Sequence, residues 1–164
     1  MINIQKTILI FLAAVFVSQI VFYYPILPDT VATHFNAQGK ADGFMYKHNF
    51  AVFEGVLLIF ILSLPYWNLA LMNIMPSSLI NMPNRDFWFA EERREATLKT
   101  LKTYFEWLSV ALLTMFIGIN QLAIKANLGE DKILSGKFWI VLGAFLLFIV
   151  VWTAKFYKRF RRIY

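Results

Sequence analysis

The chain has 164 residues, of which 59% are hydrophobic and only 16% are charged, a balance that a water-soluble domain cannot bury. It contains no cysteine, which excludes disulfides, thiolate metal sites and cysteine nucleophiles. The net charge of +6 does not indicate nucleic-acid binding, because the basic residues cluster beside apolar stretches and at the C-terminus. The composition predicts an integral membrane protein whose first partner is the lipid bilayer.

Four apolar stretches each approach the length of about 20 residues that crosses the hydrocarbon core of a bilayer. Because backbone amides in lipid must be satisfied within the segment, each stretch is predicted to be a helix. The fold class is therefore all-α, an integral membrane four-helix bundle that forms one domain over residues 1–164. The predicted spans are residues 7–24, 49–73, 104–124 and 138–156.

The first span follows Lys6 and is longer than the apolar region of a secretory signal, so it is predicted to remain in the protein. Thr7 is the expected N-cap of this helix. Pro25 and Pro28 are expected to end it, since proline cannot continue a helix.

The outer loop, residues 25–48, holds both histidines of the chain in a dense polar setting. Residues 31–36 alternate in a way that favours a short extended piece, while residues 36–43 are predicted to be a turn, with Gly39 and Gly43 supplying positive φ. The loop is expected to be ordered and to bind a ligand or partner. With one carboxylate of the next span, the candidate binding residues are Asp29, His34, Phe35, Asn36, Asp42, Lys47 and Glu54.

A metal site in this loop is the alternative hypothesis, because Asp29, His34, Asp42 and His48 are ligand types that suit Zn²⁺. Their spacing matches no metal-binding motif, however, and turn formation, backbone hydrogen bonds and a helix start explain them more simply. No metal or other cofactor is therefore expected.

The second span carries two unusual residues. Glu54 lies near its outer margin, where a carboxylate needs a partner such as Lys47 or His48, a wet cavity, or access to headgroup water, and the sequence leaves these alternatives open. Pro65 is expected to kink the helix, with neighbouring helices, Ser63 or Asn68 satisfying the freed backbone group.

Residues 84–103 keep helical spacing of apolar residues and are predicted to form an amphipathic cytoplasmic helix that continues into the third span or meets it at a bend. Asn84 or Asp86 is the expected cap. Lipid anchoring is favoured over protein docking for the surface residues of this segment, which are Arg85, Trp88, Arg93 and Arg94.

The orientation follows from the distribution of lysine and arginine. Lys6, the five basic residues in 85–102 and the five in 155–162 make eleven on one side, against five on the other. The richer side is predicted to be cytoplasmic, so both termini lie inside and the outer loop lies outside.

Two motifs resemble a known family. The pattern LPDTVATHFNAQGKADGF and the later run INMPNRDFWFAEERRE are similar to the signatures of a bacterial family of small multi-pass membrane proteins, a domain of unknown function related to the SdpI toxin-immunity proteins. The resemblance implies a bundle in the cytoplasmic (inner) membrane. In the SdpI relatives it implies protection against a secreted membrane-active toxin and signalling to a repressor.

The functional hypothesis is therefore an immunity-like or signalling protein that binds a peptide toxin or another membrane protein through the outer loop. No motif of an intramembrane protease, a serine hydrolase or a nucleotide-binding enzyme is present, so catalysis is not favoured. The alternative is a metal- or proton-dependent membrane enzyme or small transporter that uses His34, Asp42 and Glu54.

Overall fold

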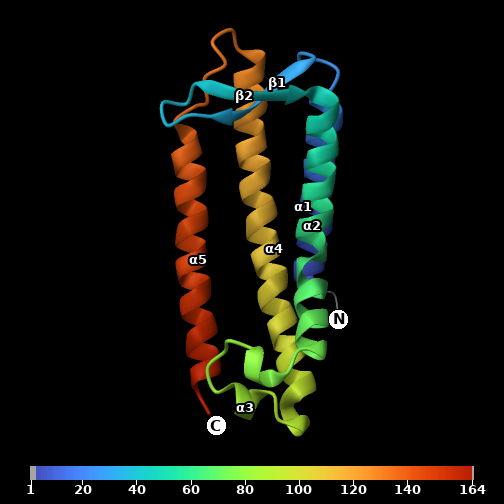
Figure 1. Cartoon of the computed structure of the whole chain (residues 1–164), viewed down its shortest axis with the longest axis vertical. Coiled ribbons are helices and arrows are strands. Elements are labelled where there is room, and N and C mark those ends of the chain that lie inside the picture. Colours follow the sequence, from blue (N-terminus) through green and yellow to red (C-terminus); the bar gives the residue numbers. More distant parts are fainter. Residues whose placement is uncertain (1–2, 164) are drawn as a thin grey trace.

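Four long helices dominate the computed structural model, which describes residues 3–163 apart from the side chain of Ser77. They are α1 (Ile4–Tyr23), α2 (Lys47–Ile74), α4 (Glu91–Leu128) and α5 (Lys137–Arg161), and they run alongside one another (Figure 1). Each is long and apolar enough to cross a membrane. The chain is thus mostly helical, with four candidate membrane-spanning helices, as the sequence predicted.

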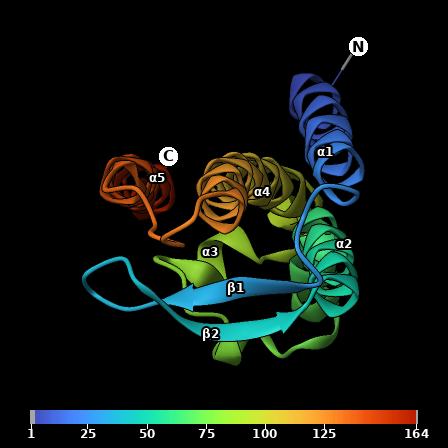
Figure 2. The same ribbon diagram turned by 90° about the horizontal axis from the view of Figure 1, so that it is seen from above.

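Helix α4 is the centre of the bundle, with α1 and α2 on one side and α5 on the other (Figure 2). Three groups of buried residues lie along it. The outer group is Leu27, Val31, Phe50 and Ile124; the middle group is Leu9, Phe16, Ile61 and Leu113; the inner group is Ile80, Met82, Trp88, Phe89, Leu101 and Phe160.

The predicted helix starts differ from the observed ones. Asn3, and not Thr7, caps α1, because its Oδ1 accepts a hydrogen bond from the N–H of Lys6 at 3.1 Å. Helix α2 begins at Lys47, two residues before the predicted start of the second span, because the preceding strand runs directly into it. Helix α1 ends at Tyr23, two residues before Pro25, as expected for a proline stop.

Pro65 lies inside α2 and has no N–H. The carbonyl of Ile61, four residues earlier, therefore lacks the donor that it would have in a regular helix. The hydroxyl of Ser109, on α4, donates to this carbonyl at 3.0 Å. Ser63 and Asn68, the other predicted donors, bond to Phe60 and Leu64 instead. The neighbouring helix therefore satisfies the backbone group that proline leaves free.

The connection between α2 and α4, called the inner connection below, contains a short 3₁₀ segment, η1 (Ser77–Leu79), followed by a single helical turn, α3 (Arg85–Trp88). Asn84 adopts a left-handed conformation, with φ of 49°, and residues 89–90 interrupt the helical run that the sequence predicted from residue 84. Beyond the break, α4 runs unbroken through residue 103 into the third span. Its 38 residues measure about 57 Å, well beyond the roughly 30 Å of hydrocarbon, so part of it must extend out of the bilayer.

The outer loop forms a two-stranded antiparallel sheet at the other end of the bundle (Figure 1). Strand β1 (Thr30–Phe35) matches the predicted extended piece. Strand β2 (Ala41–Tyr46) includes residues 41–43, which were wrongly predicted to be turn. The chain reverses within residues 36–40, because the side chain of Asn36 accepts hydrogen bonds from the N–H groups of Gln38 and Lys40. The predicted all-α bundle therefore carries a β-hairpin.

Candidate functional site

The base of the hairpin is held by Asp29 and Lys47, two of the predicted binding residues. The Lys47 ammonium lies 3.0 Å from Asp29 Oδ1 and also donates to the carbonyl of Leu27 at 3.3 Å. The N–H of Lys47 donates to the carbonyl of Asp29 at 2.9 Å. These contacts tie the chain entering β1 to the chain leaving β2, so both residues hold the hairpin in place.

Asn127, which the sequence analysis missed, attaches β1 to the outer end of α4. Its Oδ1 accepts from the N–H of Ala32 at 2.6 Å, and its Nδ2 donates to the carbonyl of Ala32 at 2.9 Å. The amide thus pairs with the backbone as a neighbouring strand would. Asn127 lies three residues beyond the predicted third span, and its amide side chain was the only sequence signal for this role.

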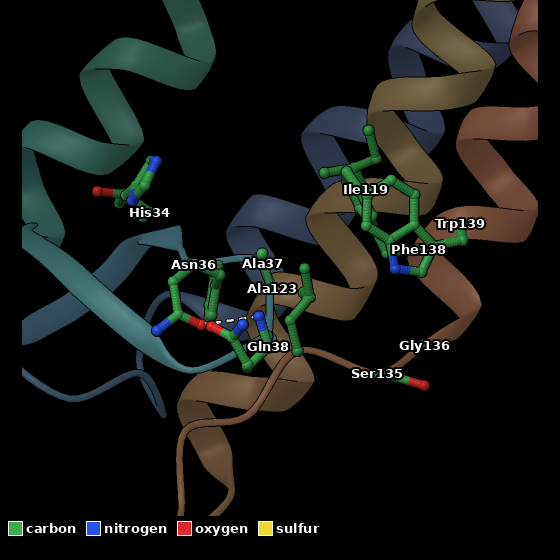
Figure 3. Close-up of a pocket in the computed structure, with 14 residues that line it drawn as sticks. His34, Asn36, Ala37, Gln38, Ile119, Ala123, Ser135, Gly136, Phe138 and Trp139 are labelled. Atoms are coloured by element: carbon green, nitrogen blue, oxygen red, sulfur yellow. Dashed lines mark hydrogen bonds between the residues drawn. The ribbon is translucent and has the colours of Figure 1, made fainter.

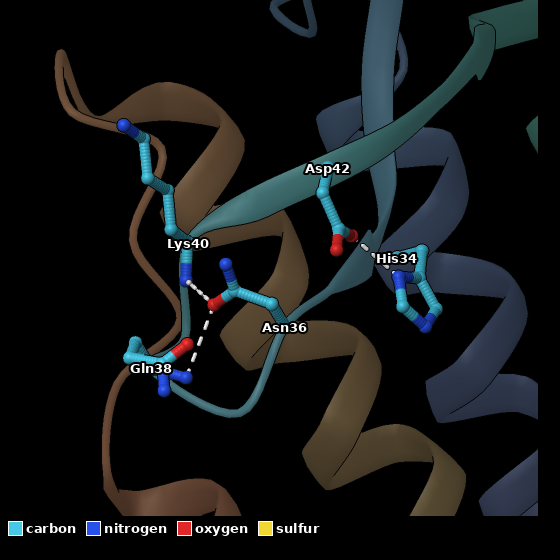
Figure 4. A network of polar contacts seen from close by, with 5 residues as sticks. All are labelled: His34, Asn36, Gln38, Lys40 and Asp42. Atoms are coloured by element: carbon cyan, nitrogen blue, oxygen red, sulfur yellow. Dashed lines mark hydrogen bonds and ion pairs between the residues drawn. The ribbon is translucent and has the colours of Figure 1, made fainter.

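The tip of the hairpin is closed by Asn36 and rests on the α4–α5 connection. Asn36 Oδ1 accepts from the N–H groups of Gln38 and Lys40, each at 3.0 Å (Figure 4). Gly39 has a φ of 79°, as predicted, and its carbonyl accepts from the N–H of Leu134 at 2.8 Å. The hairpin is therefore fixed at its tip as well as at its base.

His34 and Asp42 face one another across the two strands and form an ion pair through Nδ1 and Oδ1 (Figure 4). Their side chains are 73% and 43% exposed. Gly43 allows this pairing by close approach and not by positive φ, since a Cβ there would lie 2.8 Å from Cβ of His34. The pair links the two strands to each other and remains accessible to solvent.

The described residues contain no group of three or more histidine, aspartate or glutamate side chains placed to hold a metal ion. Asp29 is paired with Lys47 and His34 with Asp42, so these carboxylates belong to two separate ion pairs. The four residues considered for a metal site do not converge.

A pocket of about 480 Å³ lies beneath the hairpin tip (Figure 3). Residues 33–39 of the hairpin form one wall and include His34, Asn36 and the half-buried Phe35. Helix α4 contributes Ile119 and Ala123, and the start of α5 contributes Phe138 and Trp139. The pocket combines polar and aromatic side chains from segments about 100 residues apart, and its α4 and α5 walls were not predicted.

Glu54 lines a second cavity, of about 280 Å³, between the hairpin, α2 and α4. The side chain is 7% exposed, and its Oε2 has no hydrogen-bond partner among the described residues. Lys47, one of its two predicted partners, pairs with Asp29 instead. Of the alternatives for Glu54, the geometry matches a carboxyl group facing an internal cavity.

The inner arginines bind carbonyls of the chain itself. Arg94 Nη2 donates to the carbonyl of Met72 at 3.0 Å, and Arg93 Nε to that of Phe87 at 2.8 Å. Arg85 Nη1 donates to the backbone carbonyl of Ser78 at 2.5 Å. The Arg94 contact joins α4 to the end of α2, whereas the other two contacts join α4 to α3 and α3 to η1.

Trp88 was predicted to lie on the surface of the cytoplasmic helix, and it is buried instead. It is only 9% exposed, and its Nε1 donates to the carbonyl of Phe160 at 2.7 Å. The indole ring also packs edge-on against the ring of Phe160. Trp88 is buried because the short α3 turns its side chain toward the end of α5.

Residues 8–63 match the model of a protein family described as a domain of unknown function (DUF1648). The matched segment runs from α1 through the hairpin and into α2, so it includes His34, Asp42 and Glu54. No curated protein and no solved structure matches the chain significantly.

Proposed function

We propose that this chain is an immunity-like or signalling membrane protein that binds a peptide or protein partner through the outer hairpin. The observation that carries the proposal is the pocket beneath the hairpin tip, which presents exposed polar side chains beside Phe138 and Trp139. Buried aromatic anchors with a polar rim are typical of binding surfaces. The resemblance to the SdpI-related family supplies the immunity and signalling part of the proposal.

The way the hairpin is fixed supports a binding role. Contacts at Lys47, Asn127 and Gly39 hold it at its base, its centre and its tip. An ordered loop loses little conformational entropy when a partner binds, which favours affinity. Among the described residues, the side chains of His34 and Asp42 bond to each other and lie at the surface, so they can contact a partner without loss of the contacts at Lys47, Asn127 and Gly39.

The proposed orientation places the hairpin outside the bacterial cytoplasmic membrane and both termini in the cytoplasm. The first and last described residues lie toward the end of the bundle opposite the hairpin (Figure 1). The three groups of basic residues that number eleven lie toward that same end. An excess of lysine and arginine on one side favours the cytoplasm.

We further propose that the inner end of the chain contacts anionic lipid, with the early turns of α4 as an amphipathic cytoplasmic extension. Lys155, Lys158 and Arg159 are exposed at the end of α5. Each basic residue near an anionic leaflet contributes about 1 kcal/mol.

The metal- or proton-dependent enzyme or transporter receives less support. His34 lines the pocket at the tip, whereas Glu54 lines the other cavity, so the three residues of that hypothesis do not share one site. His34 and Asp42 are also open to solvent, where their charges are screened.

A photo-crosslinking amino acid at the exposed Gln38 tests the proposed function in cells of the source organism. It should yield a discrete adduct, and the same group at Leu147, in the exposed middle of α5, should not. His34→Ala should reduce the adduct while leaving membrane level and thermal stability nearly unchanged, since an exposed ion pair contributes little to stability.

Asn36→Ala provides the comparison, because it frees two backbone N–H groups of the turn and should lower stability together with the adduct. Parallel losses of adduct and stability in both variants would show that His34 is structural and would refute its role in binding.

A further inference from the structure

The cavity beside Glu54 contains two buried acceptor atoms that receive no hydrogen bond from any described residue. They are Glu54 Oε2, on α2, and Asn120 Oδ1, on α4. Both residues line the same cavity, and their side chains are 7% and 4% exposed. A buried acceptor without a donor destabilises the protein, and more so when it is charged, so two such acceptors in one cavity call for an explanation.

A chain of hydrogen bonds fixes which atom of Asn120 is left free. Asn120 Nδ2 donates to Gln19 Oε1 at 3.0 Å, and Gln19 Nε2 donates to Gln121 Oε1 at 2.8 Å. Gln19 Nε2 also lies 3.3 Å from the carbonyl of Ile117, which can only accept. Reversing the chain would set two oxygens against each other there. The nitrogen of Asn120 is therefore committed to Gln19, and its oxygen remains for the cavity.

The other walls of the cavity are apolar. Eleven of the residues that the structure describes line it; among these only Thr33, Glu54 and Asn120 have polar side chains, and none is basic. Three are phenylalanines: Phe50, Phe53 and Phe116. Phe53 is 55% exposed, so the cavity reaches the surface of the bundle beside α2. A group with hydrogen-bond donors at one end and an apolar body at the other therefore complements these walls.

We propose that this cavity binds the protonated amine of a small apolar or aromatic ligand. The ammonium group donates to Glu54 and Asn120, and the ring or alkyl body packs among the phenylalanines. Three N–H donors match two separate acceptors, and aromatic faces also attract a cation. The site adjoins the pocket beneath the hairpin tip, with which it shares Thr33, Ile119 and Ala123, but it contains neither His34 nor Asp42 and does not depend on the proposed partner.

The test measures binding of phenethylammonium to the purified full chain in zwitterionic nanodiscs by calorimetry, with empty nanodiscs subtracted. Two probes keep the phenyl ring and change the charged end: 2-phenylethanol is neutral, and phenylacetate is an anion. The amine should bind at least about tenfold more tightly than the alcohol, which is the expected effect of a charged hydrogen bond, and the anion should not bind.

Glu54→Gln keeps the size of the side chain and removes its charge, so it should weaken amine binding about tenfold and leave alcohol binding unchanged. Glu106→Gln is the matched control, because Glu106 is another buried carboxyl of the bundle but lies outside this cavity. It should leave amine binding unchanged.

Equal affinity for amine and alcohol would show that the cavity selects only apolar bodies, and no binding of any probe would show that water alone fills it. Either result overturns the proposal. If Glu54→Gln does not fold, the comparison of the three probes on the unaltered chain decides the question.

Discussion

Replacement of Asn127 by leucine should release the hairpin from α4 without unfolding the bundle. The leucine has a similar volume but leaves the N–H and carbonyl of Ala32 without partners, and Ala32 is only 1% exposed. Each buried group left unsatisfied costs about 1–3 kcal/mol, so the attachment should weaken by about 3 kcal/mol.

The effect can be measured as hydrogen exchange of the amides in β1. These amides exchange when the hairpin opens locally, and about 1.4 kcal/mol corresponds to a tenfold change in the opening equilibrium. A loss of about 3 kcal/mol should therefore speed exchange about hundredfold, while amides in the middle of α4 keep their protection.

Asn68→Leu is the matched control. Asn127 also donates to the carbonyl of Ala123, one turn earlier in its own helix, and Asn68 makes the same kind of bond to Leu64. The control removes that local bond alone and should not change exchange in β1. Slow exchange of β1 in Asn127→Leu would show that the contacts at the base and tip hold the hairpin without the amide, and the reasoning would be wrong.

Three further predictions concern the bundle, the turn and the orientation. Ser109→Ala leaves the carbonyl of Ile61 without a donor, so it should destabilise the chain by about 1–2 kcal/mol in detergent unfolding; an unchanged midpoint would contradict this role. Gly39→Val should cost about 2 kcal/mol in the same assay, because its φ is positive and a Cβ would meet a backbone oxygen at 2.8 Å, whereas Ala37→Val should be tolerated. Gln38→Cys introduces the sole thiol and should react with an impermeant maleimide in intact cells; reaction only after permeabilisation would reverse the topology.

The spans were predictable because length and hydropathy alone determine what can cross a bilayer. The caps were less predictable, since Thr7 and Asn3 are both suitable residues and only the hydrogen bond to Lys6 distinguishes them. The same limit applies to residues 41–43, where Asp42 and Gly43 are typical of turns. Pairing with β1 makes them strand, and a single sequence does not show that pairing.

The candidate site was predictable only in its hairpin half. His34, Asp42 and Glu54 stand out as polar residues in an apolar chain, so composition was sufficient to find them. Asn120 and Asn127 are equally polar, yet their roles depend on which face of α4 meets α1, α2 and the hairpin. The periodicity of apolar residues does not show which face of α4 meets another element, because the lipid and the neighbouring helices are both apolar.

Helix α5 is attached to the rest of the chain at its two ends and, between them, by a hydrogen bond from Trp152 Nε1 to the carbonyl of Tyr104 at 3.0 Å. The hairpin tip contacts the connection that precedes it, and Asn84 and Trp88 bond to carbonyls of its last turn. Among its described residues only Phe160 is buried, so most of the helix faces acyl chains. A helix surrounded by acyl chains needs to stay apolar and long enough, but not to keep the shape of each side chain. Selection should therefore act weakly on the middle of α5, and the fourth span can diverge between relatives until no recognisable motif remains.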